Sequence, residues 1–205
     1  TGVQTCALPI SFLRSPWGHA RIRGVDASAA RLLPGVIAVL AAEDMPASLK
    51  ERPLPLFVPN AALTQPCMPY ALAKDEVCYV GQTVALVVAE SRALAEDALA
   101  LIEVDYEPLP AVADAKRALE PDAPLSHIEY RTNVAGRMVS NVGDTDAAFA
   151  KAAHVFREEI FQHRGGPFSM ECRGAIASYD TASSYLTLWL SSQGSHRIKI
   201  GRAHV

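Results

Sequence analysis

The chain has 205 residues, of which 50% are hydrophobic and 20% charged, and its formal net charge is −3. This length and composition suit one large or two small folded domains and exclude a disordered tail, a fibre and a low-complexity linker. The slightly acidic balance argues against nucleic-acid binding and a polybasic membrane anchor. Apolar runs such as 84–89 fall far short of the roughly 20 residues of a membrane span. The first residues lack the pattern of a signal peptide.

The four cysteines do not form a recognisable framework. They are Cys6, Cys67, Cys78 and Cys172. No two of them make a CxxC pair, so their spacing predicts neither a structural zinc site nor a disulfide scaffold. We interpret them as reduced thiols of a cytoplasmic protein.

The two ends of the chain differ from its interior. Residues 1–10 and 200–205 fit no helix, strand or turn pattern and resemble translated sequencing adapters. We therefore expect the natural segment to be a fragment covering 11–199, and we expect no functional role for Cys6 or His204. The alternative is that both ends are ordinary frayed termini.

The first half of the chain predicts alternating strands and helices. Alternating or β-branched apolar runs predict strands at 20–25, 36–40, 77–80, 83–89 and 102–106. Helical spacing predicts short helices at 27–33, 41–45, 92–101 and 114–119. Asp26 and Ser91 are the expected N-caps. The apolar run 83–89 has no polar side, so we expect a central strand buried on both faces.

A proline-rich segment and a change of pattern divide the chain further. Residues 46–70 contain six prolines and predict an extended loop. Beyond a linker at 121–132, the sequence predicts a helix at 144–152, a long strand at 154–163, and a hairpin. The hairpin strands are expected at 174–179 and 185–190. The fold class is thus α/β (α+β), with one unit at 11–120 and the start of a second at 133–199.

The residues alone support little chemistry. Gly165-Gly166 is too short for a phosphate loop and indicates a plain turn. His163, Cys172 and His196 are conceivable metal ligands, but their spacing is not diagnostic. Glu171 is better explained by ion pairing with a neighbouring arginine. No Ser-His-Asp arrangement follows from the spacing.

One polar segment is more suggestive. Residues 191–197 follow the strand predicted at 185–190 directly, where open sheets place ligand contacts. Ser195 is an expected cap of a following helix, whose amino terminus would favour an anionic group. A routine strand-to-helix turn is the alternative.

Three stretches in fixed order carry a resemblance to a known family. They are FLRSPWGHARIRGVDASAARLLPGVIAVLAAEDMP at 12–46, VCYVGQTVALVVAESRALAEDALALIEVDYEPLPAV at 77–112, and MECRGAIASYD at 170–180 followed by LTLWLSSQGSH at 186–196. Together the chain resembles the molybdenum-binding large subunit of the xanthine dehydrogenase / aldehyde oxidase / aerobic carbon monoxide dehydrogenase family. The resemblance implies an a/b hammerhead domain followed by the truncated start of the molybdenum-cofactor-binding domain.

The resemblance also implies a function. The family oxidises or hydroxylates a small substrate (an aldehyde, a purine, an N-heterocycle or CO) with water as the oxygen source. Its cofactor is molybdopterin with Mo, expected in the cytosine dinucleotide form.

Gln193 matches the family glutamine that hydrogen-bonds the apical oxo ligand of molybdenum, a task that suits a neutral amide donor. The general-base glutamate of the family lies beyond this segment, so the resemblance implies no catalytic residue and no metal ligand here. The parent is then an enzyme, and this fragment is expected to be inactive alone.

Partners follow from the same resemblance. Iron–sulfur clusters and FAD are expected on partner subunits or other domains, and the full-length protein is expected to be a cytoplasmic oligomer. Two alternatives remain open. One is a standalone hammerhead module that serves assembly or protein–protein contact without catalysis. The other is an α/β binding protein outside the family.

Overall fold

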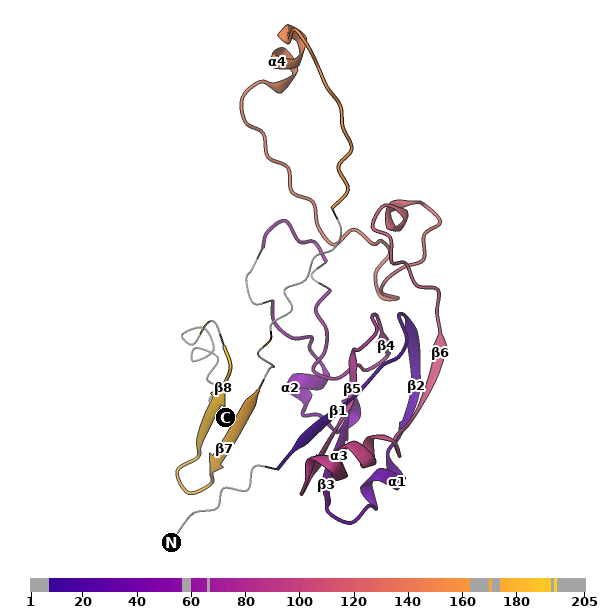
Figure 1. Cartoon of the computed structure of the whole chain (residues 1–205), viewed down its shortest axis with the longest axis vertical. Helices are drawn as coiled ribbons and strands as arrows, with labels where there is room; N and C mark the ends of the chain where they lie inside the picture. Colours follow the sequence, from indigo (N-terminus) through magenta and orange to yellow (C-terminus); the bar gives the residue numbers. More distant parts are fainter. Residues whose placement is uncertain are drawn as a thin grey trace. The chain divides into compact units, whose positions relative to one another are not determined.

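The computed structural model describes residues 8–56, 60–65, 67–162, 170, 174–192 and 194. They belong to two compact units, one of which is Leu8–Asn141 while the other holds the described residues from Val142 onward (Figure 1). Each unit is described by itself below.

The first sheet of unit Leu8–Asn141 has three antiparallel strands in the order β1-β5-β3. These strands are β1 (Ile10–Arg14), β5 (Thr83–Ala89) and β3 (Val36–Ala41). The central position predicted for the run 83–89 is confirmed. Strand β1 was not predicted; its first residue, Ile10, belongs to the segment 1–10 that matched no pattern, and the rest follows that segment directly.

Two helices, α1 (Ser28–Arg31) and α3 (Arg92–Leu99), pack against this sheet. The hydroxyl of Ser91 accepts the Leu94 N–H at 3.2 Å, which confirms the predicted cap of α3. The prediction that Asp26 caps the first helix is wrong by one position. The N-cap residue is Ala27, and the Asp26 carboxylate instead accepts the Ser28 N–H at 2.9 Å.

The main hydrophobic core lies between the helices and the sheet. Because β-strand side chains alternate, β5 turns one set toward α1 and α3. The buried residues of this core are Ala27, Ala30, Val39, Ala85, Val87, Ala89, Ala95, Ala98 and Ile102. Most of them are alanines and valines, which allow the helices to approach the sheet closely.

A second antiparallel sheet has the order β4-β2-β6 and carries the polar cluster described below. Its strands are β4 (Glu76–Val77), β2 (Ala20–Asp26) and β6 (Glu103–Pro108). The strand predicted at 77–80 is therefore shorter and earlier than expected. The chain turns immediately after it, where Gly81 has a φ of +89° and the Gln82 N–H bonds Tyr79 O.

The prediction that β5 is buried on both faces is wrong in part. Val84 is fully buried against Ala20, Ala73 and Val77 of the second core cluster. Leu86 and Val88, further along the same face, stay partly exposed. The reason is that this second cluster covers only the beginning of the strand.

Short helical turns complete the first unit. The turn predicted at 41–45 is the 3-10 helix η1 (Ala42–Asp44), and the helix predicted at 114–119 is reduced to η2 (Arg117–Leu119). The loop expected at 46–70 is interrupted by α2 (Ala47–Lys50). A bridge between Leu63 and Gly136 ties this loop to a segment that is distant in sequence.

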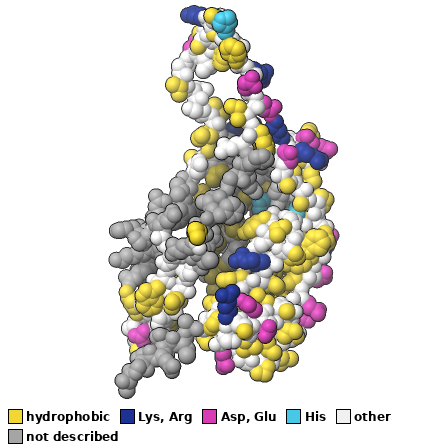
Figure 2. All heavy atoms as spheres, in the orientation of Figure 1, with side chains coloured by type: hydrophobic (Ala, Val, Ile, Leu, Met, Phe, Trp, Pro, Cys, Tyr) yellow, Lys and Arg dark blue, Asp and Glu magenta, His cyan; other side chains and the backbone are white. Residues whose placement is uncertain are grey.

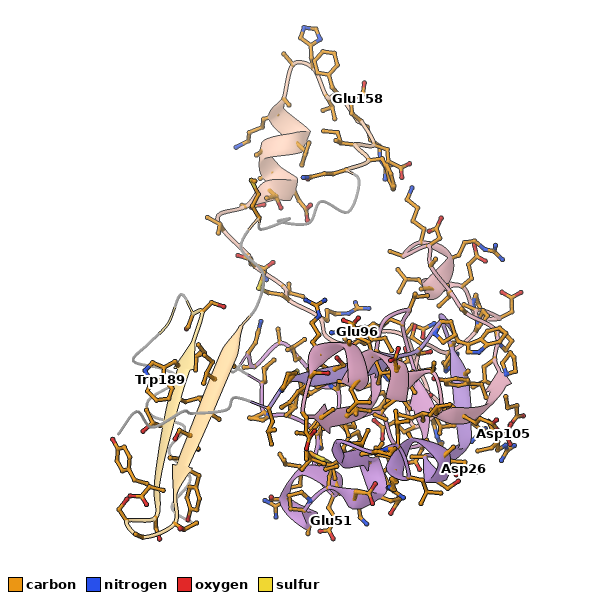
Figure 3. All side chains as sticks on the ribbon, turned by 60° about the horizontal axis from the view of Figure 1, so that its bottom comes forward. Asp26, Glu51, Glu96, Asp105, Glu158 and Trp189 are labelled. Atoms are coloured by element: carbon orange, nitrogen blue, oxygen red, sulfur yellow. The ribbon has the colours of Figure 1, made fainter. Side chains whose placement is uncertain are left out.

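The second unit contains the helix α4 (Thr145–Lys151) and an antiparallel hairpin of β7 (Ala175–Asp180) and β8 (Tyr185–Leu190). Both were predicted. The carboxylate of Asp144 accepts the Ala147 N–H at 2.9 Å and caps α4. The hairpin exposes large side chains, among them Trp189, which is 55% exposed and points away from the ribbon (Figure 3).

The long strand predicted at 154–163 is wrong over its described part, 154–162. These residues have no regular structure and are exposed, including Phe156 and Ile160 at 86% and 89%. A strand requires a hydrogen-bonding neighbour, and none of the strands in the described part of the chain pairs with this segment.

The surface agrees with the modest net charge. On the face drawn in Figure 2, basic and acidic side chains are interspersed. Among the described residues, no helix combines the length and the apolar character needed to cross a membrane.

Candidate functional site

The strongest site candidate from the sequence, Gln193, lies outside the described residues, as do His163, Glu171, Cys172 and His196. The residues on either side of Gln193 are described. The Ser191 N–H donates to Gly174 O at 3.1 Å and the Gly174 N–H donates to the Ser191 hydroxyl at 3.2 Å. One step on, the Gly194 N–H donates to the Ser192 hydroxyl at 3.0 Å.

These contacts leave hydrogen-bond donors available in the segment after β8. Both serine oxygens accept a backbone N–H, so each hydroxyl still has its own hydrogen to donate. The described neighbours of Gln193 carry neither a charge nor a strong metal ligand. This donor set fits a neutral, hydrogen-bonding contact to a polar group of a cofactor, and it does not fit direct coordination of a metal by these serines.

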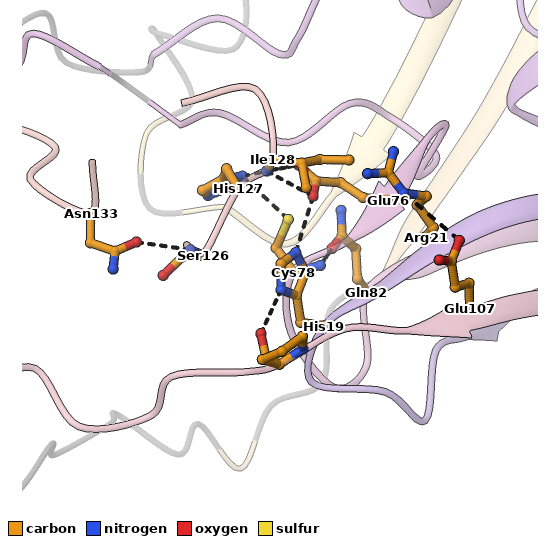
Figure 4. Close-up of polar contacts among 11 residues, drawn as sticks. His19, Arg21, Glu76, Cys78, Gln82, Glu107, Ser126, His127, Ile128 and Asn133 are labelled. Carbon is orange, nitrogen blue, oxygen red and sulfur yellow. Dashed lines mark hydrogen bonds and ion pairs between the residues drawn. The ribbon is translucent and has the colours of Figure 1, made fainter. Parts of the chain in front are cut away.

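A second polar site lies within the unit Leu8–Asn141, where a loop meets the second sheet (Figure 4). Strand β4 contributes Glu76, and the turn after it contributes Cys78. His127 comes from a loop about 50 residues further on, and His19 immediately precedes β2. His19 is 5% exposed, Glu76 14% and His127 27%, so the cluster is largely shielded from solvent.

Glu76 is the hub of this cluster. Its Oε2 lies 3.1 Å from Nε2 of His19 and accepts the Ile128 N–H at 3.1 Å. Its Oε1 lies 3.7 Å from Nδ1 of His127. The same Nδ1 lies 3.2 Å from the sulfur of Cys78. Carboxylate, imidazole and thiol therefore converge on one point.

The loops that supply these groups are held by amide side chains. The Gln82 Oε1 accepts the Cys78 N–H at 2.7 Å and fixes the turn after β4. Asn133 accepts the Ser126 N–H at 2.8 Å and donates to the carbonyls of Ala118 and Pro124 at 3.0 and 2.9 Å. Because Asn133 closes this loop on itself, His127 is held in a defined position.

Burial and hydrogen bonding act differently on the two acidic groups. Burial raises the pKa of Glu76, but hydrogen bonds from His127, the Ile128 N–H and His19 outweigh it, so the pKa is lowered overall. Burial raises the pKa of Cys78 to about 12, and the neighbouring Glu76 charge adds to this effect. In the metal-free protein, Glu76 is therefore ionised at neutral pH and Cys78 is a neutral thiol.

This arrangement does not suit nucleophilic catalysis. A Cys-His-carboxylate nucleophile needs the thiol and the carboxylate on opposite nitrogens of the imidazole. Here both face Nδ1 of His127. A thiol whose pKa is raised is also a poor nucleophile at neutral pH. The cluster is better suited to holding a cation or to bracing the loops that supply it.

The sequence analysis did not identify this cluster. Cys78 was interpreted only as a reduced thiol, and His127 fell within the segment expected to be a linker. The contacts join residues 49 to 57 positions apart. No local spacing signals such contacts, because they arise only when the loop after η2 folds back onto β4.

Two family models match the chain in succession. The model described as the aldehyde oxidase and xanthine dehydrogenase a/b hammerhead domain matches residues 3–110, more than half of the chain. The molybdopterin cofactor-binding domain model matches residues 126–205. The chain therefore belongs to the aldehyde oxidase and xanthine dehydrogenase family. The predicted fold, a hammerhead followed by the start of a molybdenum-cofactor-binding domain, is confirmed.

Similar proteins include large subunits from several bacteria. The chain is 40% identical to the carbon monoxide dehydrogenase large chain of Afipia carboxidovorans over 92% of its length, and 38% identical to the nicotine 6-hydroxylase large subunit of Paenarthrobacter nicotinovorans, also over 92%. It spans about a quarter of these relatives, 24% and 23%.

Solved structures agree with the family. Over 98% of the chain, the fold matches the Cu,Mo-CO dehydrogenase with a TM-score of 0.82 and 36% identity, covering 26% of that chain. The match to quinoline 2-oxidoreductase from Pseudomonas putida 86 has a TM-score of 0.80 and 37% identity, over 93% of this chain and 24% of the other.

Proposed function

We propose that this chain is part of the large subunit of a molybdenum hydroxylase, which oxidises or hydroxylates a small substrate with water as the oxygen source. The observation that carries the proposal is the succession of a hammerhead and a molybdopterin cofactor-binding domain along one chain. A standalone hammerhead module would not need the second domain. The names of the relatives point to different substrates, CO, nicotine and xanthine, so the substrate class stays broad: an aldehyde, a purine, an N-heterocycle or CO.

The proposed cofactor is molybdopterin with Mo, in the cytosine dinucleotide form. When bound, it supplies the two-electron redox chemistry, while the chain supplies position and hydrogen bonds. Gln193 donates an amide N–H to a polar ligand of the metal. An amide suits this contact because it donates without adding negative charge.

The described neighbours of Gln193 support this role. The pair of hydrogen bonds between Ser191 and Gly174 anchors the end of β8 to the start of β7. The Ser192–Gly194 bond constrains the backbone on both sides of position 193.

Partner subunits or other domains are proposed to carry the iron–sulfur clusters and FAD that take electrons away. The relatives support such an assembly, since one is named as the gamma subunit of the 6-hydroxypseudooxynicotine dehydrogenase complex. We further propose that the parent protein acts in the cytoplasm as an oligomer.

The proposal is tested on the complete gene product, expressed together with its neighbouring genes. Elemental analysis should find about one molybdenum per large subunit, and nucleotide analysis after cofactor hydrolysis should yield a cytosine nucleotide. Iron and flavin should co-purify. Reduction of an artificial electron acceptor by members of the four substrate classes then identifies the substrate. A purified complex that lacks molybdenum and pterin would contradict the proposal.

A further inference from the structure

We propose that Glu76, Cys78 and His127 form a site for a divalent transition-metal ion of the zinc type within the unit Leu8–Asn141, where two residues of the hammerhead meet one residue of the stretch matched by the cofactor-binding domain model. The proposal rests on the convergence of three different ligand atoms, a carboxylate oxygen, a sulfur and an imidazole nitrogen, all within 4.8 Å of one another. It does not depend on the proposed function.

The distances between the ligand atoms fit tetrahedral coordination. Zn–S, Zn–N and Zn–O bonds of about 2.0–2.3 Å place neighbouring ligand atoms about 3.3–3.6 Å apart. In the cluster, the Cys78 sulfur lies 3.2 Å from Nδ1 of His127, and Oε1 of Glu76 lies 3.7 Å from the same nitrogen. These two separations lie close to the tetrahedral values, and all three ligand atoms lie within 4.8 Å of one another.

The ligand types select the kind of metal. Calcium and magnesium prefer all-oxygen sites, whereas a thiolate and an imidazole beside one carboxylate are typical of zinc and its neighbours. One thiolate and one carboxylate would balance a charge of +2. Three protein ligands leave a fourth position for water.

The groups around the cluster already orient the ligands. The Oε2 of Glu76 is held by His19, and the Ile128 N–H donates to both carboxylate oxygens, at 3.1 Å to Oε2 and 3.3 Å to Oε1, while Oε1 faces His127. The ring of Tyr130 packs edge-on against His127 with centroids 5.7 Å apart. Such outer contacts fix ligand geometry in metal sites and are part of what makes them bind.

Each of the three groups has a lone pair that it can give to one cation. They are the Nδ1 of His127, the Cys78 sulfur 3.2 Å from it, and the Glu76 Oε1 3.7 Å from it. Coordination also deprotonates a thiol outright.

A metal here would fasten the loop that contains His127 to strand β4. Glu76 and His127 are 51 positions apart in the sequence, so the ion would close a long loop and stabilise the hammerhead against local opening. The proposed role is structural: the metal would hold the segment that leads from the hammerhead toward the second unit.

The test uses the full 205-residue chain and Co²⁺ as a spectroscopic substitute for Zn²⁺. One equivalent of Co²⁺ should produce a thiolate-to-cobalt charge-transfer band and the d–d bands of a tetrahedral site, and added Zn²⁺ should displace them. Cys78→Ser and His127→Gln should each weaken Co²⁺ binding by more than about 100-fold. Cys67→Ser is the matched control, because Cys67 is also half-buried and lies outside the cluster, and it should bind Co²⁺ like the parent.

Circular dichroism of each metal-free variant establishes whether it folds, and His127→Gln decides the question if Cys78→Ser does not. Zn²⁺ should also raise the Tm of the parent and the Cys67→Ser variant, but not that of His127→Gln. The proposal is overturned if the parent shows no charge-transfer band, if the band persists in Cys78→Ser, or if Cys67→Ser abolishes it.

Discussion

Nε2 of His19 lies 3.1 Å from the carboxylate of Glu76, while its other ring nitrogen lies 2.9 Å from the carbonyl oxygen of Pro110. A carbonyl oxygen only accepts hydrogen bonds, so Nδ1 is a donor. Nε2 faces the carboxylate, so the ring bridges a backbone carbonyl and an acidic side chain. The pair links the start of β2, strand β4 and the chain just after β6.

Removal of the Glu76 charge should destabilise the hammerhead. Glu76→Gln replaces the ionised acceptor that faces His19 and the Ile128 N–H, and hydrogen bonds to a charged group of this kind are worth about 1.5–3 kcal/mol. Urea unfolding of the chain in the presence of EDTA measures the effect. The matched control is Glu96→Gln, which breaks the exposed Arg92–Glu96 pair and should leave stability almost unchanged. Equal effects of the two substitutions would contradict the assigned role of Glu76.

Stability should fall in acid because of the same carboxylate. The pKa of Glu76 is lower in the folded protein than its usual 4.5, so the unfolded chain takes up its proton first as the pH falls. The contribution of ionised Glu76 is therefore complete above about pH 5 and is lost as the pH falls through the folded pKa. Urea midpoints measured between about pH 6 and pH 3 should drop more steeply for the parent than for Glu76→Gln. Parallel curves would show that Glu76 is not responsible.

Gly136→Ala should separate two loops of the unit Leu8–Asn141. A Cβ at this position would lie 2.4 Å from the carbonyl oxygen of Ala62 and 3.0 Å from Cα of Leu63. The backbone would have to move, which would weaken the bond from the Arg137 N–H to Ala62 O, now 3.0 Å long. We expect a loss of about 1–3 kcal/mol in unfolding free energy and faster amide exchange at Arg137.

Gly24→Ala is the control for this substitution, because a Cβ there has no atom within 4 Å. It should unfold close to the parent. A Gly136→Ala variant as stable as Gly24→Ala would show that the approach of the two loops contributes little.

The two units should behave differently when expressed apart. The hairpin exposes Tyr185, Leu186, Leu188 and Trp189 at 53%, 57%, 47% and 55%, and apolar surface of this kind favours aggregation. Residues 142–199 alone should bind a hydrophobic dye and lack a cooperative thermal transition. Residues 8–141 contain both buried core clusters and should unfold cooperatively. A sharp transition for the 142–199 piece would contradict this prediction.

Gln193→Ala in the complete enzyme should reduce turnover while leaving the fold and the molybdenum content intact. Loss of one hydrogen bond to a polar partner costs about 1–3 kcal/mol. If the bond is stronger in the transition state, kcat falls by roughly ten- to a hundred-fold. Metal analysis and steady-state kinetics on the same preparation check the result. Unchanged kcat at full molybdenum occupancy would leave Gln193 as a turn residue.

The elements predicted correctly are those whose signal is local. A few neighbouring residues are enough to recognise the apolar run of β5 and the Ser91 cap of α3. The same is true of Asp144 before α4 and of the β7–β8 hairpin. The wrong predictions concern segments whose structure or burial depends on contacts with residues distant in the sequence. The apolar pattern at 154–162 would suit a strand, but none of the described strands pairs with it. The outer face of β5 is covered only as far as Val84 because the second core cluster ends there.

The sequence alone determined the family, the order of the two domains and most of the secondary structure, because ordered motifs, strand and helix periodicity and capping residues are properties of short segments. Tertiary structure decided the polar cluster. His19, Glu76 and His127 are spread over more than one hundred positions, and only the pairing of β4 with β2 and the loop held by Asn133 bring them together. Contacts of this kind depend on chain folding over long separations, and no local pattern of residues encodes them.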